Sequence, residues 1–319
     1  MNEKNTRLIS VGVDIGGSHI TASAIDLSTK RLISGSWMRR PVDSLAEADE
    51  ILDTWAEVIR GCMESARSKY ATIGIAMPGP MDYKNGVCLI SDQQKYNALY
   101  GMNIGNLLAN RLDVDARRIN FRNDAACYLQ GELFSGSLCG YKRAIGLTLG
   151  SGLGTSHTFE GAVVDSELWN MPFLGGIAED YLSSRWFIER FREICGHKIL
   201  NVKDLVEGYH GTPPFLSLFS EFSINLALFI FKFINKTVPQ AVVIGGNIAN
   251  ADVYFMELTR KYLTEMLGYS IPIRKSALGE TAAMIGAAAF DDLAVEADVD
   301  TWAKPASGAP AGLSVSDGL

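Results

Sequence analysis

The sequence predicts a two-domain α/β protein in which one strand-and-turn unit occurs twice around a central cleft. Each half opens with an apolar strand that leads into a glycine turn, over residues 8–17 in the first half and 144–152 in the second. Strand-like and helix-like patterns alternate after both openings. The chain has 319 residues, 47% of them hydrophobic, which is enough for two separate cores.

The first half alternates strands with helices. Apolar and β-branched runs predict strands over residues 8–13, 20–25, 31–37, 71–77 and 119–122. The first three follow one another closely, so we expect them to pair as a meander. Apolar residues at helical spacing predict a long helix over 45–70 and a shorter one over 103–112.

The second half begins the pattern again. We expect strands over 144–149 and 154–158, then helices, then a strand over 241–244. The most apolar stretch, residues 222–238, is interrupted by Asn225, Lys232, Asn235 and Lys236. It is expected to be a buried helix that is too short and too polar to cross a bilayer. Residues 303–319 are rich in Ala, Gly, Pro and Ser and are expected to form a flexible tail.

Composition excludes some partners and compartments. The net charge is −7, and an acidic surface does not attract the phosphate backbone of a nucleic acid. The five cysteines are scattered without a C-x-x-C pair, which indicates a reducing compartment. The N-terminal residues lack the pattern of a signal peptide. We therefore expect a cytoplasmic protein with no membrane or nucleic-acid partner.

The first segment with chemical potential is D-I-G-G-S-H at residues 14–19, between two predicted strands. A turn with Gly16 and Gly17 brings backbone N–H groups close to a ligand, and the Ser18 hydroxyl adds a donor. Asp14 ends a buried strand, where a carboxylate is costly unless a cation compensates it. Asp14 is therefore a candidate for holding hydrated Mg²⁺, and a plain hairpin with a capped turn is the alternative.

The second segment is R-N-D-A-A at residues 122–126, where a strand passes into a helix. A helix N-terminus favours a carboxylate such as that of Asp124. Asp124 could accept a proton from an attacking hydroxyl, with Asn123 orienting the molecule that carries it. The alternative is that one of these residues only caps the helix.

Two more glycine segments follow strands. L-T-L-G-S-G-L-G-T at residues 147–155 would let the main chain of Gly150, Ser151 and Gly152 pack against phosphates. It is neither a P-loop nor a Rossmann turn. V-V-I-G-G-N at residues 242–247 brings Gly245 and Gly246 to a strand tip, which suits close approach of an adenine or ribose. A tight strand-to-helix turn explains the V-V-I-G-G-N segment equally well.

The order of these motifs resembles the ROK family of bacterial sugar kinases. The resemblance covers about residues 8–290 and includes I-G-I-A-M-P-G-P-M-D at 73–82 and A-M-I-G-A-A-A at 283–289. It implies the two-lobed ATPase fold of actin, hexokinase and Hsp70, which is built from duplicated ribonuclease H-like domains. A small domain over 1–123, completed by a C-terminal helix near 280–295, would face a large domain over 124–279.

The resemblance also implies roles for individual residues. Asp124 would be the catalytic base and Asn123 would hold a ring hydroxyl of a hexose. The turns at Gly16-Gly17-Ser18 and Gly150-Ser151-Gly152 would hold the ATP phosphates with Mg²⁺, and Gly245 and Gly246 would border the adenosine. The implied sugar-binding residues are Pro78, Gly79, Glu167, Asn170 and Glu179. Family members are commonly homodimers, so a homodimer is expected.

One part of the family pattern is missing. Members usually carry E-[IL]-G-H and then C-x-C-G-x-x-G-C-x-E-x-Y-x-S, which supply a zinc site. Residues 167–170 read E-L-W-N and residues 175–183 read G-G-I-A-E-D-Y-L-S, so Asn170 replaces the histidine and the cysteines are absent. No structural zinc is expected. Packing by Trp169, Met171 and Phe173 is expected to brace the sugar loop instead.

Other functions stay open. Some relatives are sugar-responsive transcriptional repressors with a helix-turn-helix ahead of the kinase-like body, but only about seven residues precede the first strand here. A catalytically silent sugar sensor is a second alternative, because Asn170 and the lost cysteines change the sugar loop. Among substrates, glucose comes first, followed by N-acetylmannosamine, N-acetylglucosamine, fructose and allose.

Overall fold

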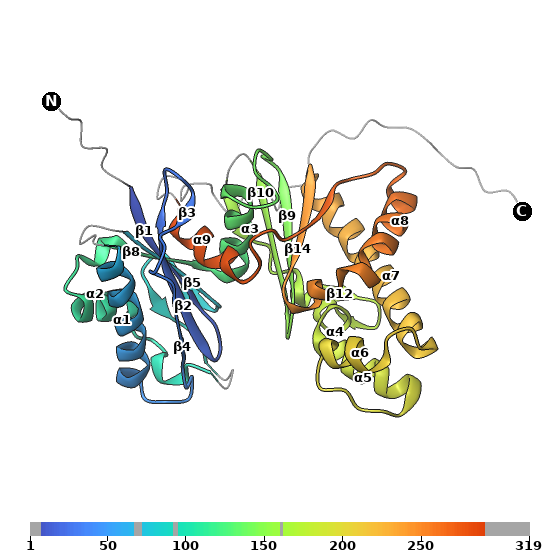
Figure 1. The fold of residues 1–319 in the computed structure, drawn as a ribbon, viewed down its shortest axis with the longest axis horizontal. Helices are drawn as coiled ribbons and strands as arrows, with labels where there is room; N and C mark the ends of the chain where they lie inside the picture. The colour runs from blue at the N-terminus through green and yellow to red at the C-terminus, as the bar shows by residue number, and fades with distance from the viewer. Residues whose placement is uncertain (1–7, 67–71, 92–94, 160–161, 291–319) are drawn as a thin grey trace, which may run out of the picture.

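The computed structural model describes residues 8–66, 72–91, 95–159 and 162–290. Figure 1 shows two lobes, each with its own β-sheet, and helices α3 (Asp124–Phe134) and α9 (Ala282–Ala288) between them. The N-terminal residues, for which no signal peptide is expected, and the predicted flexible tail over 303–319 lie outside the described residues.

The sheet of the first lobe has six described strands. They are β1 (Ile9–Ile15), β2 (His19–Asp26), β3 (Arg31–Leu32), β4 (Met38–Pro41), β5 (Thr72–Met77) and β8 (Ile119–Asn123). Their order is β3-β2-β1-β5-β8, with β4 also pairing with β2. β1 and β2 are antiparallel, whereas β5 runs parallel to both β1 and β8. A short hairpin of β6 (Met81–Asp82) and β7 (Val87–Cys88) follows β5.

The sheet of the second lobe repeats this arrangement. Its described strands are β9 (Ala144–Leu149), β10 (Leu153–Phe159), β11 (Ala162–Asp165), β14 (Ala241–Gly245) and β15 (Ile273–Lys275). Their order is β11-β10-β9-β14-β15. β9, β10 and β11 pair antiparallel, and β9, β14 and β15 pair parallel. The same succession of pairings in both sheets confirms the predicted duplication.

Helices cover the outer faces of the sheets (Figure 1). The first lobe has α1 (Ala48–Ser65) and α2 (Ile104–Leu112), and α1 buries Ile51, Trp55 and Ile59 against the sheet. The second lobe has α4 (Ala178–Leu182), α5 (Ser184–Cys195), α6 (Val202–Tyr209), α7 (Pro213–Thr237) and α8 (Met256–Leu267). Phenylalanine side chains along α7 form the centre of this lobe's core. Apolar burial of this kind is the main driving force for each lobe.

Three predicted elements differ from the observed ones. Of the expected strand over 31–37, only Arg31–Leu32 (β3) is a strand, because Gly35 has a left-handed φ of +78° and turns the chain before β4 begins at Met38. The helix expected from residue 45 begins at Ala48. The apolar stretch at 222–238 belongs to α7, a 25-residue helix, so its prediction as too short to span a bilayer was wrong.

Within the described residues, α7 is the one helix long and apolar enough to cross a membrane by length and composition. Its buried side chains include Phe219, Phe222, Phe229 and Phe233, which contact α5, the short strand β12 (Pro172–Phe173) and one another. The core helix of a globular lobe has this pattern, because its apolar side chains are buried against other parts of the protein. α7 is therefore a core helix in this fold.

Helix α9 lies directly on the backbone of three other elements. A Cβ atom on Gly12 of β1 would lie 2.1 Å from the carbonyl oxygen of Met284, and one on Gly74 of β5 would lie 1.9 Å from that of Ala287. In the other direction, a Cβ on Gly286 would lie 1.8 Å from the carbonyl oxygen of Cys127 in α3. Glycine is required at these positions because any side chain would force the elements apart.

A buried carboxylate fixes the loop that leads into α9. Glu132 of α3 is 0% exposed, and its oxygens accept hydrogen bonds from Ser137 N–H at 2.7 Å and the Ser276 hydroxyl at 2.5 Å. The backbone N–H groups of Ala277 and Leu278 also donate to it, at 3.3 and 3.0 Å. A buried carboxylate is tolerated when donors surround it in this way. Glu132 therefore ties α3 to the segment between β15 and α9.

The close contact between α3 and α9 makes Gly286 sensitive to substitution. We expect Gly286→Ala to lower the free energy of unfolding by about 1–3 kcal/mol, because the new methyl group has no space. Gly208→Ala on α6 is the matched control, since a Cβ there meets nothing within 4 Å. The control should be neutral or stabilising, as alanine is the better helix former. Urea unfolding of both variants tests this, and equal stability of the two would contradict it.

Candidate active site

The strands of the first sheet bring three predicted site segments to one edge. Asp14 of β1 is in register with Ala76 of β5, and Ala76 is in register with Arg122 of β8. Since these strands are parallel, their carboxyl ends meet at the same edge. The Gly16 turn, Pro78-Gly79 and Asn123-Asp124 therefore leave the sheet side by side.

Asn123 and Asp124 lie at the start of α3 and divide two tasks. Asn123 is the N-cap: its Oδ1 accepts hydrogen bonds from the N–H groups of Ala125 at 2.8 Å and Ala126 at 3.1 Å. Its side-chain NH₂ group makes a long contact of 3.5 Å with the Tyr83 hydroxyl. Asp124 Oδ1 accepts from Ala125 N–H at 2.9 Å. The capping alternative thus holds for Asn123, while Asp124 lines the cavity described below.

The carboxylates at this edge are hard to ionise in the free protein. Removal from water raises the pKa of Asp124, although the Ala125 N–H and the charge of Lys95 act in the opposite direction. Removal from water, and then the neighbouring Asp124, raise the pKa of Asp14 to about 7. Two carboxyl groups so placed are more stable with a cation nearby. Asp14 therefore fits the water-mediated Mg²⁺ contact predicted for it.

The turn after β1 is a tight hairpin anchored from below. Gly16 N–H donates to His19 carbonyl oxygen at 2.9 Å, and the Tyr96 hydroxyl donates to the Gly16 carbonyl oxygen at 2.5 Å. The space around a Cβ on Gly17 is open to 4 Å. Ser18 Oγ lies 2.9 Å from His19 Nδ1. Gly17 and Ser18, at the tip of the turn, are therefore exposed and accessible to a ligand.

A second glycine turn faces the site from the other lobe. Ser184 donates its N–H and its hydroxyl to the Gly150 carbonyl oxygen, at 2.7 and 3.0 Å. Glu179 Oε2 accepts from Leu153 N–H at 3.0 Å, and a Cβ on Gly152 would lie 2.7 Å from that oxygen. The turn thus approaches other groups closely only because it carries glycine.

The two glycines after β14 differ in position. Gly245 is in register with Thr148 of β9, and a Cβ on Gly245 would meet the Tyr128 hydroxyl at 2.5 Å. Gly245 is therefore buried against α3. Gly246 has a φ of +83° and lies against the backbone of Leu149, at the edge of the cavity. Of this pair, Gly246 alone lines the cavity among the described residues.

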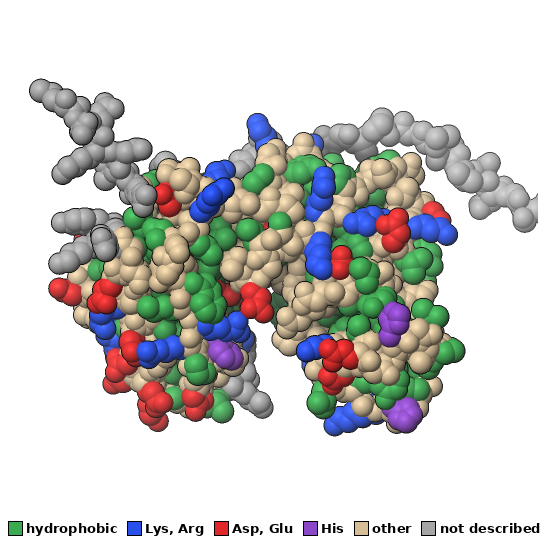
Figure 2. Space-filling view, viewed as in Figure 1, with side chains coloured by type: hydrophobic (Ala, Val, Ile, Leu, Met, Phe, Trp, Pro, Cys, Tyr) green, Lys and Arg blue, Asp and Glu red, His purple; other side chains and the backbone are tan. Residues whose placement is uncertain are grey.

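A cavity of about 890 Å³ brings most of these residues together. Figure 2 shows the molecule divided by a deep cleft, and the lining residues come from both lobes. The predicted residues that line it are Pro78, Gly79, Asn123, Asp124, Gly150, Ser151, Gly152, Glu167, Asn170, Glu179 and Gly246. The cavity lining lacks Asp14, Gly16, Gly17, Ser18 and Gly245. Tyr96, which follows the lining residue Lys95, donates its hydroxyl to the Gly16 carbonyl oxygen, so the Gly16 turn adjoins the cavity.

One side of the cavity is rich in exposed polar groups. Glu167 has a left-handed φ of +49° and begins the short 3₁₀ helix Leu168–Asn170. The side chains of Glu167 and Asn170 are exposed, and no hydrogen bond joins either of them to another described residue. Glu179 has its Oε1 3.1 Å from Arg185 Nη2. Glu167 and Asn170 are therefore free to bind a ligand, and Glu179 is partly occupied.

Sequence reasoning missed two charged residues of the cavity. Asp165 ends β11 and accepts a hydrogen bond from Glu167 N–H at 2.9 Å. Burial, opposed by that N–H group and reinforced by Asp124 and Glu167, raises the pKa of Asp165 to about 6. Lys95 is the one Lys, Arg or His among the described lining residues. Asp165 and Lys95 belong to neither a glycine motif nor a helix start, so no local pattern in the sequence indicates that they line the cavity.

The loop predicted to need a brace is a closed hairpin, β12 (Pro172–Phe173) with β13 (Gly176–Ile177). Phe173 is buried between Tyr181 and Phe229, with ring centroids 5.6 and 6.0 Å apart. Asp180 Oδ2 accepts from Ile177 N–H at 3.0 Å, and Gly175 N–H donates to the Tyr181 hydroxyl at 3.1 Å. Phe173 is thus a brace as predicted.

Met171 packs partly buried against the same core as Phe173. The prediction for Trp169 was wrong, because this side chain is exposed and lines the cavity instead. The described residues include no group of three or more His, Cys, Asp or Glu placed to hold a metal ion. The hairpin is held by the packing of Phe173 and by hydrogen bonds to Asp180 and Tyr181.

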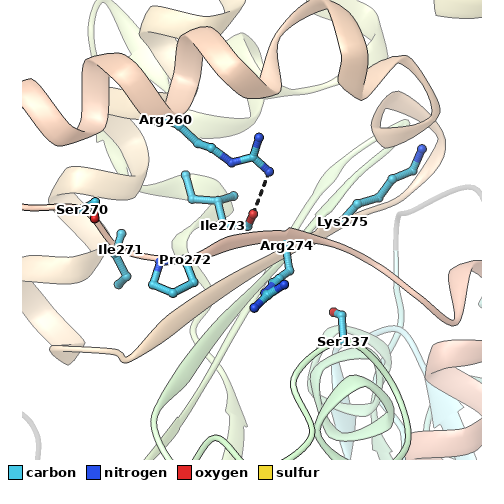
Figure 3. Close-up of a pocket in the computed structure, with 8 residues that line it drawn as sticks. All are labelled: Ser137, Arg260, Ser270, Ile271, Pro272, Ile273, Arg274 and Lys275. Atoms are coloured by element: carbon cyan, nitrogen blue, oxygen red, sulfur yellow. Dashed lines mark hydrogen bonds between the residues drawn. The ribbon is translucent and has the colours of Figure 1, made fainter.

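A second cavity, of about 640 Å³, lies beside β15 and carries three basic side chains. Figure 3 shows that Arg260 and Arg274 lie on opposite sides of the strand. Arg260 donates to the Ile273 carbonyl oxygen at 2.9 Å, and Lys275 is 2.8 Å from Asp252 Oδ1. The basic groups do not converge on one point, so this cavity lacks the geometry of an anion site.

Comparison with known proteins gives consistent matches over most of the chain. The sequence profile of the ROK family matches residues 10–167 and 176–292. An N-acetyl-D-glucosamine kinase of Mannheimia succiniciproducens is 25% identical over 316 residues, covering 88% of this chain and 98% of that protein.

Solved structures match the same region. The crystal structure of a ROK hexokinase from Thermus thermophilus has a TM-score of 0.72 at 22% identity, covering 88% of this chain and 96% of that one. A ROK family transcriptional regulator, a homologue of the E. coli MLC protein, has a TM-score of 0.73 at 16% identity. It covers 89% of this chain but 78% of the regulator. The shared fold confirms the predicted two-lobed actin-like ATPase architecture.

The raised pKa of Asp14 gives a testable stability effect. Between its ordinary pKa of 3.8 and about 7, the folded protein keeps a proton that the unfolded chain has lost. Stability from this group therefore falls as pH rises through that range. Asp14→Asn cannot ionise, so we expect its melting temperature to exceed that of the wild type at pH 8, with the difference shrinking towards pH 4. Thermal unfolding without divalent cations tests this, and a variant less stable at pH 8 would contradict it.

The hairpin packing predicts independence from zinc. Metal analysis of the purified protein should find no stoichiometric zinc, and a zinc-selective chelator should leave the melting temperature unchanged, because the hairpin is closed by its own hydrogen bonds. Asp180→Ala, which removes the acceptor of Ile177 N–H, should lower the melting temperature by a few degrees. A chelator effect as large as that of Asp180→Ala would refute this account of the hairpin.

Proposed function

Because this chain belongs to the ROK family, we propose that it is a sugar kinase that transfers the γ-phosphoryl group of ATP to a hexose hydroxyl. One observation carries the proposal: a single cleft is lined by Asp124 at a helix start, by a glycine turn, and by a group of exposed carboxylate and amide side chains. Phosphoryl transfer needs these three parts, namely a base, a phosphate cradle and a substrate clamp. The N-acetylglucosamine kinase match supports the same reaction class.

Asp124 is the proposed general base. It accepts the proton of the attacking hydroxyl as the oxygen–phosphorus bond forms, and the bond between the γ-phosphorus and the bridging oxygen breaks to release ADP. Its raised pKa makes the carboxylate a better proton acceptor than one in water. Its position at the N-terminus of α3 opposes this rise in the pKa, because the helix dipole favours the ionised form. Burial and the helix N-terminus therefore act on the pKa of Asp124 in opposite directions, and burial is the larger effect.

The acceptor sugar is assigned to the exposed polar side of the cavity. Glu167 and Asn170 are free to bind hydroxyl groups, and Asn123 can add a donor from its side-chain NH₂ group. Pro78 and Gly79 line the wall on the first-lobe side. Holding the sugar at several points converts the reaction into an oriented, effectively unimolecular step.

The nucleotide is assigned to the two glycine turns. The Gly150–Gly152 turn and Gly246 line the cavity, and the Gly16–Ser18 turn adjoins it. Asp14, which is largely removed from water and interacts electrostatically with Asp124, fits a water-mediated contact with Mg²⁺. When bound, Mg²⁺ and ATP supply the phosphoryl group and neutralise charge on its oxygens. The chain itself contributes position and exclusion of water.

Substrate and setting are proposed more finely from the relatives. Glucose and N-acetylglucosamine are the first candidates, since hexokinase and N-acetylglucosamine kinase relatives match over most of the chain. A cytoplasmic homodimer follows from the family resemblance. A sugar sensor without turnover is the competing function, favoured by the match to a transcriptional regulator and by Asn170 in place of the family histidine.

Asp124→Asn separates these functions. In a coupled ADP-release assay over a panel of hexoses and N-acetylhexosamines, we expect sugar-dependent turnover by the wild type. The variant should lose about 10²–10⁴ in kcat, because it cannot accept the proton, while its KM changes little. Thermal unfolding should show that the variant is folded, since its amide can still accept from Ala125 N–H.

Two outcomes would contradict the proposal. Sugar binding by calorimetry without turnover on any sugar of the panel would favour the sensor. Near-normal turnover by Asp124→Asn would remove Asp124 as the base. Ser135→Ala serves as a control at the other end of α3, outside the cavity lining, and should keep wild-type kinetics.

A further inference from the structure

An exposed tryptophan stands in the polar half of the cleft. Trp169 is 44% exposed and lines the cavity between Glu167 and Asn170. It is the one aromatic side chain among the described lining residues. An indole that remains open to water gives up the apolar burial that the rest of this core uses. Its place therefore calls for an explanation other than packing.

The turn that carries Trp169 is fixed on both sides of it. The preceding Leu168 is buried, and its N–H donates to Thr155 Oγ1 at 2.9 Å. The following Met171 donates its N–H to the Leu168 carbonyl oxygen at 3.2 Å. Glu167 enters the turn in a left-handed conformation. The backbone thus holds the indole over the cavity without help from the indole itself.

We propose that Trp169 stacks against a C–H face of the acceptor sugar and selects pyranoses whose hydroxyl groups are all equatorial, such as glucose and N-acetylglucosamine. This inference rests on the proposed sugar kinase function. A pyranose of this kind has a polar rim and two apolar faces. Glu167, Asn170 and Asn123 can bind the rim, and an aromatic ring supplies the surface that a face requires.

The proposal makes a distinction among epimers. An axial hydroxyl at C2 (mannose) or C4 (galactose) projects from one face of the ring, whereas an axial hydroxyl at C3 (allose) projects from the other. A hydroxyl pointing at the indole would be desolvated without a partner. The stacked face therefore decides whether mannose and galactose or allose is the poorer substrate, and removal of the ring should erase that preference.

The test compares Trp169→Leu and Trp169→Phe with Trp37→Leu. Trp37 is the matched control, because it is 50% exposed but lies outside the cavity lining. For glucose or N-acetylglucosamine, Trp169→Leu should raise KM on the order of tenfold with little change in kcat, as expected for loss of one aromatic contact. Trp169→Phe should keep most of the affinity, and Trp37→Leu should equal the wild type.

Binding without ATP gives an independent readout. Sugar titration should change tryptophan emission in the wild type and in Trp37→Leu, and should leave the emission of Trp169→Leu unchanged. The inference is overturned if Trp169→Leu keeps wild-type KM values and epimer ratios, or if sugar still changes its emission to the wild-type extent.

Failure of the proposed function gives a different pattern. A wild type that binds sugars with a Trp169-dependent emission change but turns over none of them refutes the kinase and supports the stacking site. A wild type that binds no sugar of the panel refutes both.

Discussion

The architecture depends on helix α9 lying in direct contact with backbone. Glycines at 12, 74 and 286 leave no side chain between α9 and β1, β5 or α3, so the last described helix of the chain is bound to the first strand and to the central helix. α3 in turn begins at Asp124. The position of the proposed base is thus set by close packing of α9 on α3 at Cys127, three residues after Asp124. The buried carboxylate of Glu132 holds the segment that delivers α9 to this place.

The cleft is arranged around negative charge. Asp124, Asp165, Glu167 and Glu179 all line it, with Lys95 as the one basic side chain among the described lining residues. Such a cavity is poorly suited to a polyanion such as ATP unless a metal ion and backbone N–H groups compensate. In the proposed function, the two glycine turns would supply the backbone groups and Asp14 would hold the ion through water. The same carboxylates suit the hydroxyl-rich rim of a sugar.

Much of this could be predicted from the sequence because its signals are local. A buried strand followed by glycine, as at Gly16 and Gly150, specifies both a turn and its place at a sheet edge. The start of α3 could be predicted in the same way, since Asn123 and Asp124 follow a strand and precede a helical pattern. The sequence predicts that Gly245 borders the adenosine. Its packing against Tyr128 is a tertiary contact, which the neighbouring residues in the sequence do not indicate. Lys95, Asp165 and the outward position of Trp169 depend on how loops fold across the cleft, which periodicity does not encode.

Asn123 illustrates how a structural duty narrows a chemical one. Its oxygen is committed to two N–H groups of α3, so it has only hydrogens left to offer. The carboxylate of Asp124 beside it, when ionised, has only lone pairs. An ether oxygen or a fluorine atom would satisfy the first residue and be repelled by the second. Asn123 thus binds a hydrogen-bond acceptor of the bound molecule, and Asp124 binds a donor. A molecule bound in the reverse orientation would make neither hydrogen bond.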